Sequence, residues 1–310
     1  MSTAGLGVVV PVHGEVDPVL PLLRSVVEDP AVRRVVVVDD ASPCRWDEDA
    51  MPPGVHLLRR EVNGGFGAAV NSGLAALAAE PGIGHALVLN SDLTIPAGFA
   101  RALLEHTAPW MPAVAGCRIL GLDGGSAYSA RRFPTIGHQV VEWLVPLASH
   151  RHRDLLHRAV GHDVRADRSH GVLPVDWVSG AVLLLPLPEV LGVGGFDEGY
   201  FMYTEEVDLQ LRLRRREIPS VLDADLRAVH TGGGSAGGES RRRQWLVGAR
   251  MRYARKHGHV HLLRTCLVAA SVVNLVWNTG RRVTGRDVRP LAVAAEEFDL
   301  VLRAGRELPA

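Results

Sequence analysis

The sequence predicts an α/β fold built on a doubly wound, mostly parallel sheet. Short apolar, β-branched runs alternate with stretches whose apolar residues recur at helical spacing. The apolar runs are continuous, which is typical of strands buried on both faces. Such alternation implies parallel strands joined by right-handed helical crossovers. The expected strands are Val8–Val12, Val35–Val38, Val55–Leu58 and His85–Leu89.

Two helices are expected between these strands, Val16–Glu28 and the alanine-rich Ala68–Ala79. In doubly wound sheets, ligands collect beyond the carboxyl ends of the strands. Asp39, Asp40 and Asp92 all lie just past the ends of expected strands. We therefore expect these three carboxylates to converge on one crevice.

The second half of the chain has weaker patterns. Residues 121–170 are expected to form loops and a short helix around Val140–Leu147. Val172–Leu185 has strand character, interrupted at Ser179-Gly180. Thr204–Arg216 is an expected helix, and the chain is helical again from Gln244 onward.

Composition limits the classes of function. Lys+Arg and Asp+Glu number 34 each, so no global field favours nucleic acid as a partner. The three cysteines are widely separated, which argues against a disulfide framework and a zinc knuckle and fits a reducing compartment. The N-terminus lacks the basic region of a secretory signal, so we expect a cytoplasmic protein.

The C-terminal part is strongly basic. Residues 241–289 carry twelve Lys or Arg against one acid, Asp287, so we expect a core domain over 1–240 and a basic helical extension over 241–310. Leu262–Trp277 is the most apolar long stretch, but polar residues leave it short of the ~20 needed to span a bilayer. Two interpretations stay open: an interfacial helix attracted to anionic lipid, or a core helix packed on the first domain.

Asn90-Ser91-Asp92 follows a buried strand and is a candidate metal motif. A carboxylate there can hold Mg²⁺ or Mn²⁺ between the protein and diphosphate oxygens. The ordinary alternative is that Asp92 caps the next helix. His230 is a candidate second ligand, because imidazole suits Mn²⁺-class ions, although a single histidine is more often structural.

Three acids, Glu205, Glu206 and Asp208, open the expected helix after residue 204. Acids at a helix start are common, since negative charge suits the helix dipole. Here, however, an aromatic cluster precedes them, which would desolvate a carboxylate and raise its pKa, as a general base requires. The cluster comprises Phe196, Tyr200, Phe201 and Tyr203.

The stretch Asn63–Asn71 resembles a dinucleotide fingerprint only in part. Gly65-x-Gly67 lacks the third glycine and the following acid, so a Rossmann oxidoreductase is the weaker alternative. The free N–H groups of this stretch suit contacts to phosphate or ribose.

Taken together and in order, these segments resemble family 2 glycosyltransferases with the GT-A fold. The resemblance covers roughly residues 6–240 and is closest to the rhamnosyltransferase-like branch, which acts on lipid-linked or cell-wall glycan precursors. The matching stretches are Val8–His13, Val37–Ser42, Asn63–Phe66, Asn71–Gly73, Leu89–Asp92, Trp177–Ala181, Gly194–Glu198, Tyr203–Leu209, and His230 with Gly233 and Ser235.

The resemblance implies an inverting, metal-dependent hexosyltransferase. Its partners would be a dTDP-, UDP- or GDP-linked sugar, such as a rhamnose donor, and a glycan or lipid-linked acceptor hydroxyl. Its cofactor would be Mg²⁺ or Mn²⁺. A basic tail that binds anionic lipid would hold the protein at the inner face of the cell membrane.

The resemblance also assigns roles to residues. Those that would contact the nucleotide sugar are Pro11, His13, Asp39, Asp40, Asn63, Gly65, Asn90 and Ser91. Asp92 would bind the metal with His230 as its partner. Trp177, Ser179 and Gly180 would face the sugar or the acceptor.

The Glu205-Glu206 pair would supply the catalytic base, with Asp208 as the alternative base. Two positions depart from the family pattern. Asn90 stands at the first acidic position of the DxD-type motif, which leaves one carboxylate for the metal. Glu206 stands where the family usually has Asp, which shifts the base by one methylene and raises a second possibility, a catalytically silent sugar-nucleotide binding protein.

Overall fold

The computed structural model describes residues 5–150, 153–231 and 238–304, without the side chains of 148–150 and 239. The chain forms two compact units. The sheet unit comprises residues 1–131 and 165–235, and the helical unit comprises residues 132–164 and 236–309. The expected boundary at residue 240 is close to the start of the second helical segment, but residues 132–164 group with the helical unit as well.

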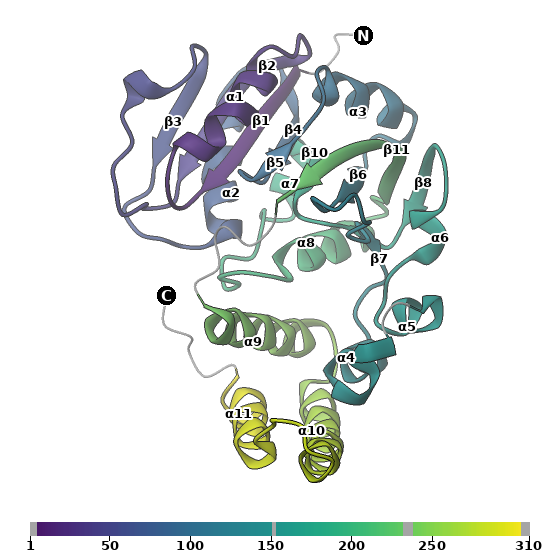
Figure 1. The fold of residues 1–310 in the computed structure, drawn as a ribbon. Helices are drawn as coiled ribbons and strands as arrows, with labels where there is room; N and C mark the ends of the chain where they lie inside the picture. The colour runs from purple at the N-terminus through teal and green to yellow at the C-terminus, as the bar shows by residue number, and fades with distance from the viewer. Residues whose placement is uncertain (1–4, 151–152, 232–237, 305–310) are drawn as a thin grey trace. The chain divides into compact units, whose positions relative to one another are not determined.

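The sheet unit contains a nine-stranded mixed sheet (Figure 1). Its strand order is β3-β2-β1-β4-β10-β6-β11-β5, with β8 paired to β11. The first four strands of this order are parallel, as the sequence predicts. They are β1 (Gly5–Val12), β2 (Val32–Asp39), β3 (Val55–Arg59) and β4 (Ile83–Leu89).

The other half of the sheet is mixed. β10 (Val182–Pro186) runs antiparallel to β4 and to β6 (Val114–Leu120). β11 (Ser220–His230) is parallel to β6 and antiparallel to β5 (Leu93–Thr94) and β8 (Val172–Val175). β7 (Ala130–Arg131) and β9 (Trp177–Val178) form a separate two-stranded sheet.

Helices cover both faces of the main sheet, because alternate residues of each central strand point to opposite sides. Val8 and Val10 face α1 and α3, whereas Val9 faces α2, α7 and α8. The helices are η1 (Asp17–Val19), α1 (Leu20–Val27), η2 (Glu48–Ala50), α2 (Phe66–Ala78), α3 (Phe99–Thr107), η3 (Ala108–Trp110), α6 (Val164–Asp167), α7 (Leu187–Gly192) and α8 (Glu205–Arg214).

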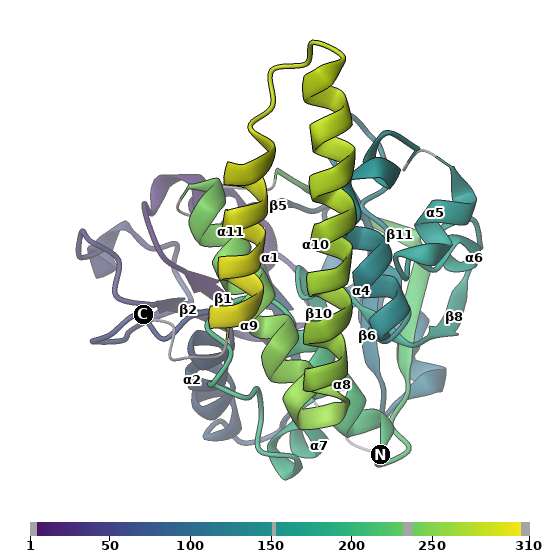
Figure 2. The ribbon, with the colours of Figure 1, turned by 90° about the horizontal axis from the view of Figure 1, so that it is seen from below.

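The helical unit is built from α4 (Ile136–Trp143), η4 (Val145–His150), α5 (Asp154–Ala159), α9 (Glu239–His257), α10 (Val260–Val283) and α11 (Pro290–Arg303). α10 and α11 lie side by side (Figure 2). Met251, Leu263 and Val301 belong to its apolar core. The expected loops of 121–170 are therefore largely helical where they join this core.

Two polar residues that interrupt the apolar stretch of α10 make hydrogen bonds inside the helical unit. Ser271 accepts a 2.8 Å hydrogen bond from the Trp143 indole. Asn274 accepts from the Val145 N–H at 2.9 Å and donates to the Trp143 carbonyl at 3.0 Å. Contrary to the expectation for Leu262–Trp277, α10 with its 24 residues and a mean hydropathy of 1.6 is long and apolar enough to cross a membrane, by length and composition alone. Of its most apolar window 28% is buried, so one face is core and the other is exposed.

The glycine loop expected after His230 lies, apart from Gly238, outside the described residues, as do Gly233 and Ser235 of the family motif.

Candidate functional site

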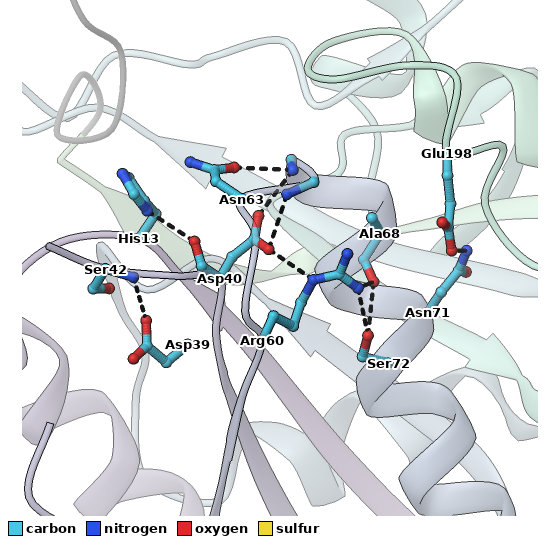
Figure 3. Close-up of polar contacts among 12 residues, drawn as sticks. His13, Asp39, Asp40, Ser42, Arg60, Asn63, Ala68, Asn71, Ser72 and Glu198 are labelled. Carbon is cyan, nitrogen blue, oxygen red and sulfur yellow. Dashed lines mark hydrogen bonds and ion pairs between the residues drawn. The ribbon is translucent and has the colours of Figure 1, made fainter. Parts of the chain in front are cut away.

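The two aspartates after β2 organise neighbouring loops (Figure 3). Asp39 is fully buried, accepts from the Ser42 N–H at 2.8 Å and pairs with Arg59. Asp40 accepts from the N–H groups of Gly64 and Gly65, at 3.1 and 2.8 Å. Each carboxylate therefore fixes a turn at the carboxyl edge of the sheet.

His13 and Arg60 complete the surroundings of Asp40. The exposed His13 ring donates from Nδ1 to the Asp40 carbonyl at 2.9 Å. Arg60 Nε lies 2.8 Å from the Asp40 carboxylate, and the same guanidinium donates to Ser72 on α2. Pro11 is buried within β1 opposite Val38, so it shapes this edge without offering a polar contact.

Gly65 is required by geometry. Its φ is +82°, and a Cβ there would lie 1.8 Å from the carbonyl oxygen of Phe201. Its N–H also donates to the Asn63 side chain at 3.1 Å. The loop between β3 and α2 can therefore approach the segment before α8 only with glycine at this position.

Asn71 ties α2 to the Gly194–Glu198 turn. Its amide donates to Glu198 at 2.9 Å (Figure 3). The same amide donates to the carbonyl of Phe196 at 2.9 Å, and its oxygen accepts from the Phe196 N–H at 2.8 Å. Segments separated by 125 residues in the sequence are thereby held together.

The expected metal residues meet. His230 Nε2 lies 2.8 Å from Asp92 Oδ1 and 3.4 Å from Asn90 Nδ2. The pairing of β5 with β11 places His230 opposite Leu93 and explains the contact. The next helix, α3, has Gly98 as its N-cap, so Asp92 does not cap it. Ser91, between Asn90 and Asp92, is half-buried.

A carboxylate and an imidazole, both about one quarter exposed, suit an Mn²⁺-class ion. Among the described residues there is no group of three or more His, Cys, Asp or Glu side chains able to hold a metal. The pair therefore fits an ion that takes its remaining ligands from substrate oxygens and water, as Mg²⁺-type ions do at phosphate sites.

The turn between β9 and β10 contacts this motif and α8. The Ala181 carbonyl accepts from the Asn90 N–H at 2.9 Å. A Cβ placed on the neighbouring Gly180 would lie 3.5 Å from Cβ and Cγ of Glu206, so the Glu206 side chain lies beside the open face of Gly180. Ser179 donates its N–H to the Ser129 carbonyl at 2.8 Å.

Gln210 fixes the position of α8 against β9. Its amide accepts from the N–H of Val178 and donates to the carbonyl of Val178, both at 2.8 Å, as a neighbouring strand would. The helix begins abruptly at Glu205, because Tyr203 and Thr204 both have φ of +72°.

The three acids of α8 occupy different environments. Glu205 is 4% exposed, and its Oε2 has no hydrogen-bond partner in the described structure. Burial raises the pKa of Glu205 well above its usual value, and the charge of Glu206 adds to this. Burial also raises the pKa of the half-buried Glu206, whereas nearby backbone N–H groups and Arg131 oppose the shift.

Asp208 is fully buried and accepts from Arg212 Nε at 2.8 Å. Arg212 also donates to the carbonyls of Val193 and Gly195, at 2.7 and 2.6 Å. Asp208 is thus part of an ion pair that braces the glycine turn before α8.

Arg131 and Trp177 pair across β7 and β9, with the guanidinium carbon 5.7 Å from the indole centroid, within cation–π range. Trp177 is largely buried. The charge of Arg131 acts on Glu206, where it partly offsets the rise in pKa that burial causes.

Comparison with known proteins gives the family. Residues 7–159 match the family model described as Glycosyl transferase family 2. The chain carries a glycosyl transferase family 2 domain. The predicted family is therefore confirmed.

Two curated relatives of this chain come from Mycobacterium tuberculosis. An N-acetylglucosaminyl-diphospho-decaprenol L-rhamnosyltransferase is 34% identical over 189 residues, covering 57% of this chain and 59% of the relative. A pre-mycofactocin glycosyltransferase is 31% identical over 217 residues, covering 66% of this chain and 40% of the relative. The match to the first of these supports the rhamnosyltransferase-like branch.

The crystal structure of GalNAc-T7 with UDP, GalNAc and Mn²⁺ resembles this family 2 chain with a TM-score of 0.55 and 13% identity. The match covers 81% of this chain and 47% of that one. It confirms the predicted GT-A type fold.

The sequence patterns did not predict a role for some residues of the candidate site. Arg131 and Gln210 act through contacts with β9 that no local spacing indicates. Asn71 belongs to the Asn71–Gly73 stretch that matches the family, and this match is the signal in the sequence that indicates a role for it.

Proposed function

We propose that the protein is an inverting glycosyltransferase that moves a sugar, such as rhamnose, from a nucleotide diphosphate to an acceptor hydroxyl. The observation that carries the proposal is the Ser179–Ala181 turn. The Ala181 carbonyl accepts from the Asn90 N–H in the metal motif, and Gly180 lies beside the side chain of Glu206, the proposed base. One short turn thus joins the groups that would bind the leaving diphosphate to the group that would accept the proton.

The donor would lie at the carboxyl edge of β1, β2 and β4, where His13, Asp40 and Asn63 form one hydrogen-bonded cluster (Figure 3). Asp39 would hold the turn that faces the nucleotide base. Asn63 and Gly65 would line the donor pocket, and Asn90 and Ser91 would approach its diphosphate. This arrangement follows the rule that ligands of open α/β sheets bind beyond the carboxyl ends of strands.

Asp92 and His230 would hold a divalent cation, Mg²⁺ or Mn²⁺, together with donor oxygens. When bound, that cation supplies positive charge that stabilises the departing diphosphate. The contact between the two side chains supports their use as ligands of one ion. Asn90 contributes an amide where a second carboxylate is common, which leaves the site with less negative charge.

Glu206 would accept the proton of the acceptor hydroxyl as that oxygen attacks the anomeric carbon. The bond between the sugar and the diphosphate breaks on the opposite face, so the configuration inverts. The position of Glu206 beside Gly180 and its raised pKa support this role, because a base works best with a pKa near the working pH. The buried Glu205, whose pKa burial raises, would orient the acceptor. Trp177 and Ser179 would border the sugar or the acceptor.

The acceptor would be a glycan or a lipid-linked, cell-wall glycan precursor. The names of the rhamnosyltransferase relatives support an acceptor of this class. The basic residues of α9 and α10 and the exposed apolar face of α10 suit a cytoplasmic protein associated with the anionic inner face of the membrane.

The test is nucleoside diphosphate release from dTDP-, UDP- and GDP-sugars with prenyl diphosphate-linked sugars as acceptors, with and without Mn²⁺. We expect release with one donor class that depends on both the acceptor and the metal. A thermal-shift screen of the same donors should show stabilisation by that class. If no nucleotide sugar stabilises the protein and none is consumed, the proposal fails.

A further inference from the structure

An exposed apolar groove runs along α10 in the helical unit. Val272, Val273, Val276 and Trp277 are 47–68% exposed, which is unusual for side chains of this size. The groove has a volume of about 580 Å³, within the range of ligand pockets. Its walls are Pro146, Val272, Val273, Val276, Trp277, Gly280, Arg281 and Thr284.

The helix spacing makes this a defined groove. Val272, Val276 and Gly280 form one row at intervals of four residues, and Val273, Trp277 and Arg281 form the adjacent row. A Cβ on Gly280 would meet no atom within 4 Å, so the groove is open where that side chain is missing. The opposite side of α10, with Leu263, Leu267 and Asn274, is buried in the core of its own unit.

One end of the groove is cationic. Arg281 lines it, and Arg282, Arg286 and Arg289 follow within eight residues. Asp287 is the one acid between residues 258 and 289, and it pairs with Arg282 at 3.8 Å. The surface therefore combines an apolar channel with a basic end, which complements an anionic lipid with a hydrocarbon chain.

We propose that this groove binds the prenyl chain of a lipid diphosphate acceptor, with Arg281 at the diphosphate end. The inference rests on the proposed function and adds the site that recognises the lipid part of the substrate. A single chain is favoured over a flat bilayer contact because α10 and Pro146 line a groove of about 580 Å³ that is open at Gly280.

The experiment uses the full chain and geranylgeranyl diphosphate as the probe, with binding measured by isothermal titration calorimetry. Val276→Asp places a charge in the groove, and Gly280→Leu fills it without burying a polar group. Leu262→Asp is the matched control, because Leu262 is 53% exposed on the same helix but does not line the groove. We expect at least tenfold weaker binding for the first two variants and a change below twofold for the control.

Arg281→Gln tests the polar end. It should weaken binding of geranylgeranyl diphosphate several-fold and leave binding of the uncharged alcohol geranylgeraniol unchanged. Equal binding of the diphosphate by all four variants, or no binding by the wild type, overturns the inference.

Two other occupants give distinct results, each of which contradicts the proposal. If Val276→Asp and Leu262→Asp lose binding to phosphatidylglycerol vesicles equally while the wild type ignores the soluble probe, the face is a bilayer contact. If the wild type is a dimer by light scattering and Val276→Asp is a monomer, the occupant is a second copy.

Turnover separates this inference from the proposed function. With a short-chain, water-soluble acceptor, Val276→Asp should keep the wild-type rate, whereas its KM for a prenyl-linked acceptor should rise at least tenfold. If Val276→Asp is active and its KM for the prenyl-linked acceptor is unchanged, the groove proposal fails and the proposed function stands. Probe binding that is lost in Val276→Asp, in a protein that consumes no nucleotide sugar, supports the groove and contradicts the proposed function.

Discussion

The imidazole Nε2 of His230 lies 2.8 Å from the carboxylate of Asp92, although 138 residues separate them. The short strand β5 begins one residue after Asp92 and pairs with the end of β11, which places His230 opposite Leu93. The Thr231 N–H then donates to the Asp92 carbonyl at 3.1 Å and fixes the backbone around the pair. Strand pairing, rather than a local motif, therefore creates the proposed metal site.

Asp92→Asn should abolish metal-dependent donor binding and turnover while leaving the fold intact. The substitution keeps the size and the contact to His230 but removes the one carboxylate of the motif. Isothermal titration with Mn²⁺ and a nucleoside diphosphate measures binding, and circular dichroism measures the fold. Full metal-dependent activity in this variant would remove Asp92 from the site.

Gly65→Ala should destabilise the protein far more than Gly98→Ala. Both glycines have left-handed backbone, with φ of +82° and +69°, which costs an alanine about 1–2 kcal/mol. At Gly65 the new Cβ would also lie 1.8 Å from the Phe201 carbonyl, whereas at Gly98 it would meet nothing within 4 Å. Urea unfolding gives the comparison. Equal free energies of unfolding for the two variants would show that the loop relaxes freely.

Continuous apolar runs predicted the parallel half of the sheet correctly, because both faces of β1, β2 and β4 are buried. β11 is as central to the site, yet it escapes this rule since it contains Asp223 and Asp225. Asp223 is buried at 1% exposure and accepts from His106 and from the backbone of Leu226. A strand whose acidic side chains are hydrogen-bonded by residues distant in sequence has no continuous apolar run, so its sequence does not predict a buried strand.

The residues of the candidate site also fall into those that the sequence predicts and those that it does not. Acids at strand ends and the helix start are visible in the sequence, because their position follows from local structure. Arg131 and Gln210 are not, since their contacts depend on β9 lying beside β7 and α8. Asn274 even reads as an interruption of an apolar stretch, although it is a buried hydrogen-bonding partner of Trp143.

Glu205→Gln should make stability less dependent on pH. Burial raises the folded-state pKa of Glu205 above its unfolded value, so the folded protein binds more protons. The stability of the wild type is therefore complete below the unfolded pKa and falls as pH rises toward the folded pKa, by up to about 1.4 kcal/mol per pH unit. Glutamine cannot ionise, so melting temperatures of the variant should fall less between pH 5 and 8. Parallel curves of melting temperature against pH for the two proteins would contradict a raised pKa of Glu205.

Arg131→Gln should move the acidic limb of the rate profile to higher pH. Glu206 must be ionised to accept a proton, and its pKa is raised by burial and lowered by Arg131. Loss of the cation leaves the effect of burial opposed only by the nearby backbone N–H groups, so the pKa of Glu206 should rise further. The profile of kcat/KM against pH measures the shift, and Arg131→Lys, which keeps the charge, is the control. A fall in rate with no movement of the limb would mean that Arg131 acts only through packing on Trp177.

Glu206→Gln and Asp208→Asn should distinguish the catalytic base from the carboxylate that stabilises the turn before α8. Glu206→Gln keeps the size of the side chain beside Gly180 but cannot take a proton, so turnover should fall by about 10²–10⁴-fold with donor affinity unchanged. Asp208→Asn breaks a fully buried ion pair with Arg212, which should cost about 3–5 kcal/mol of stability. Its folded fraction should nevertheless keep most of its turnover. Wild-type turnover in Glu206→Gln with an inactive but folded Asp208→Asn would transfer the base to Asp208, and activity in both would exclude either carboxylate as the base.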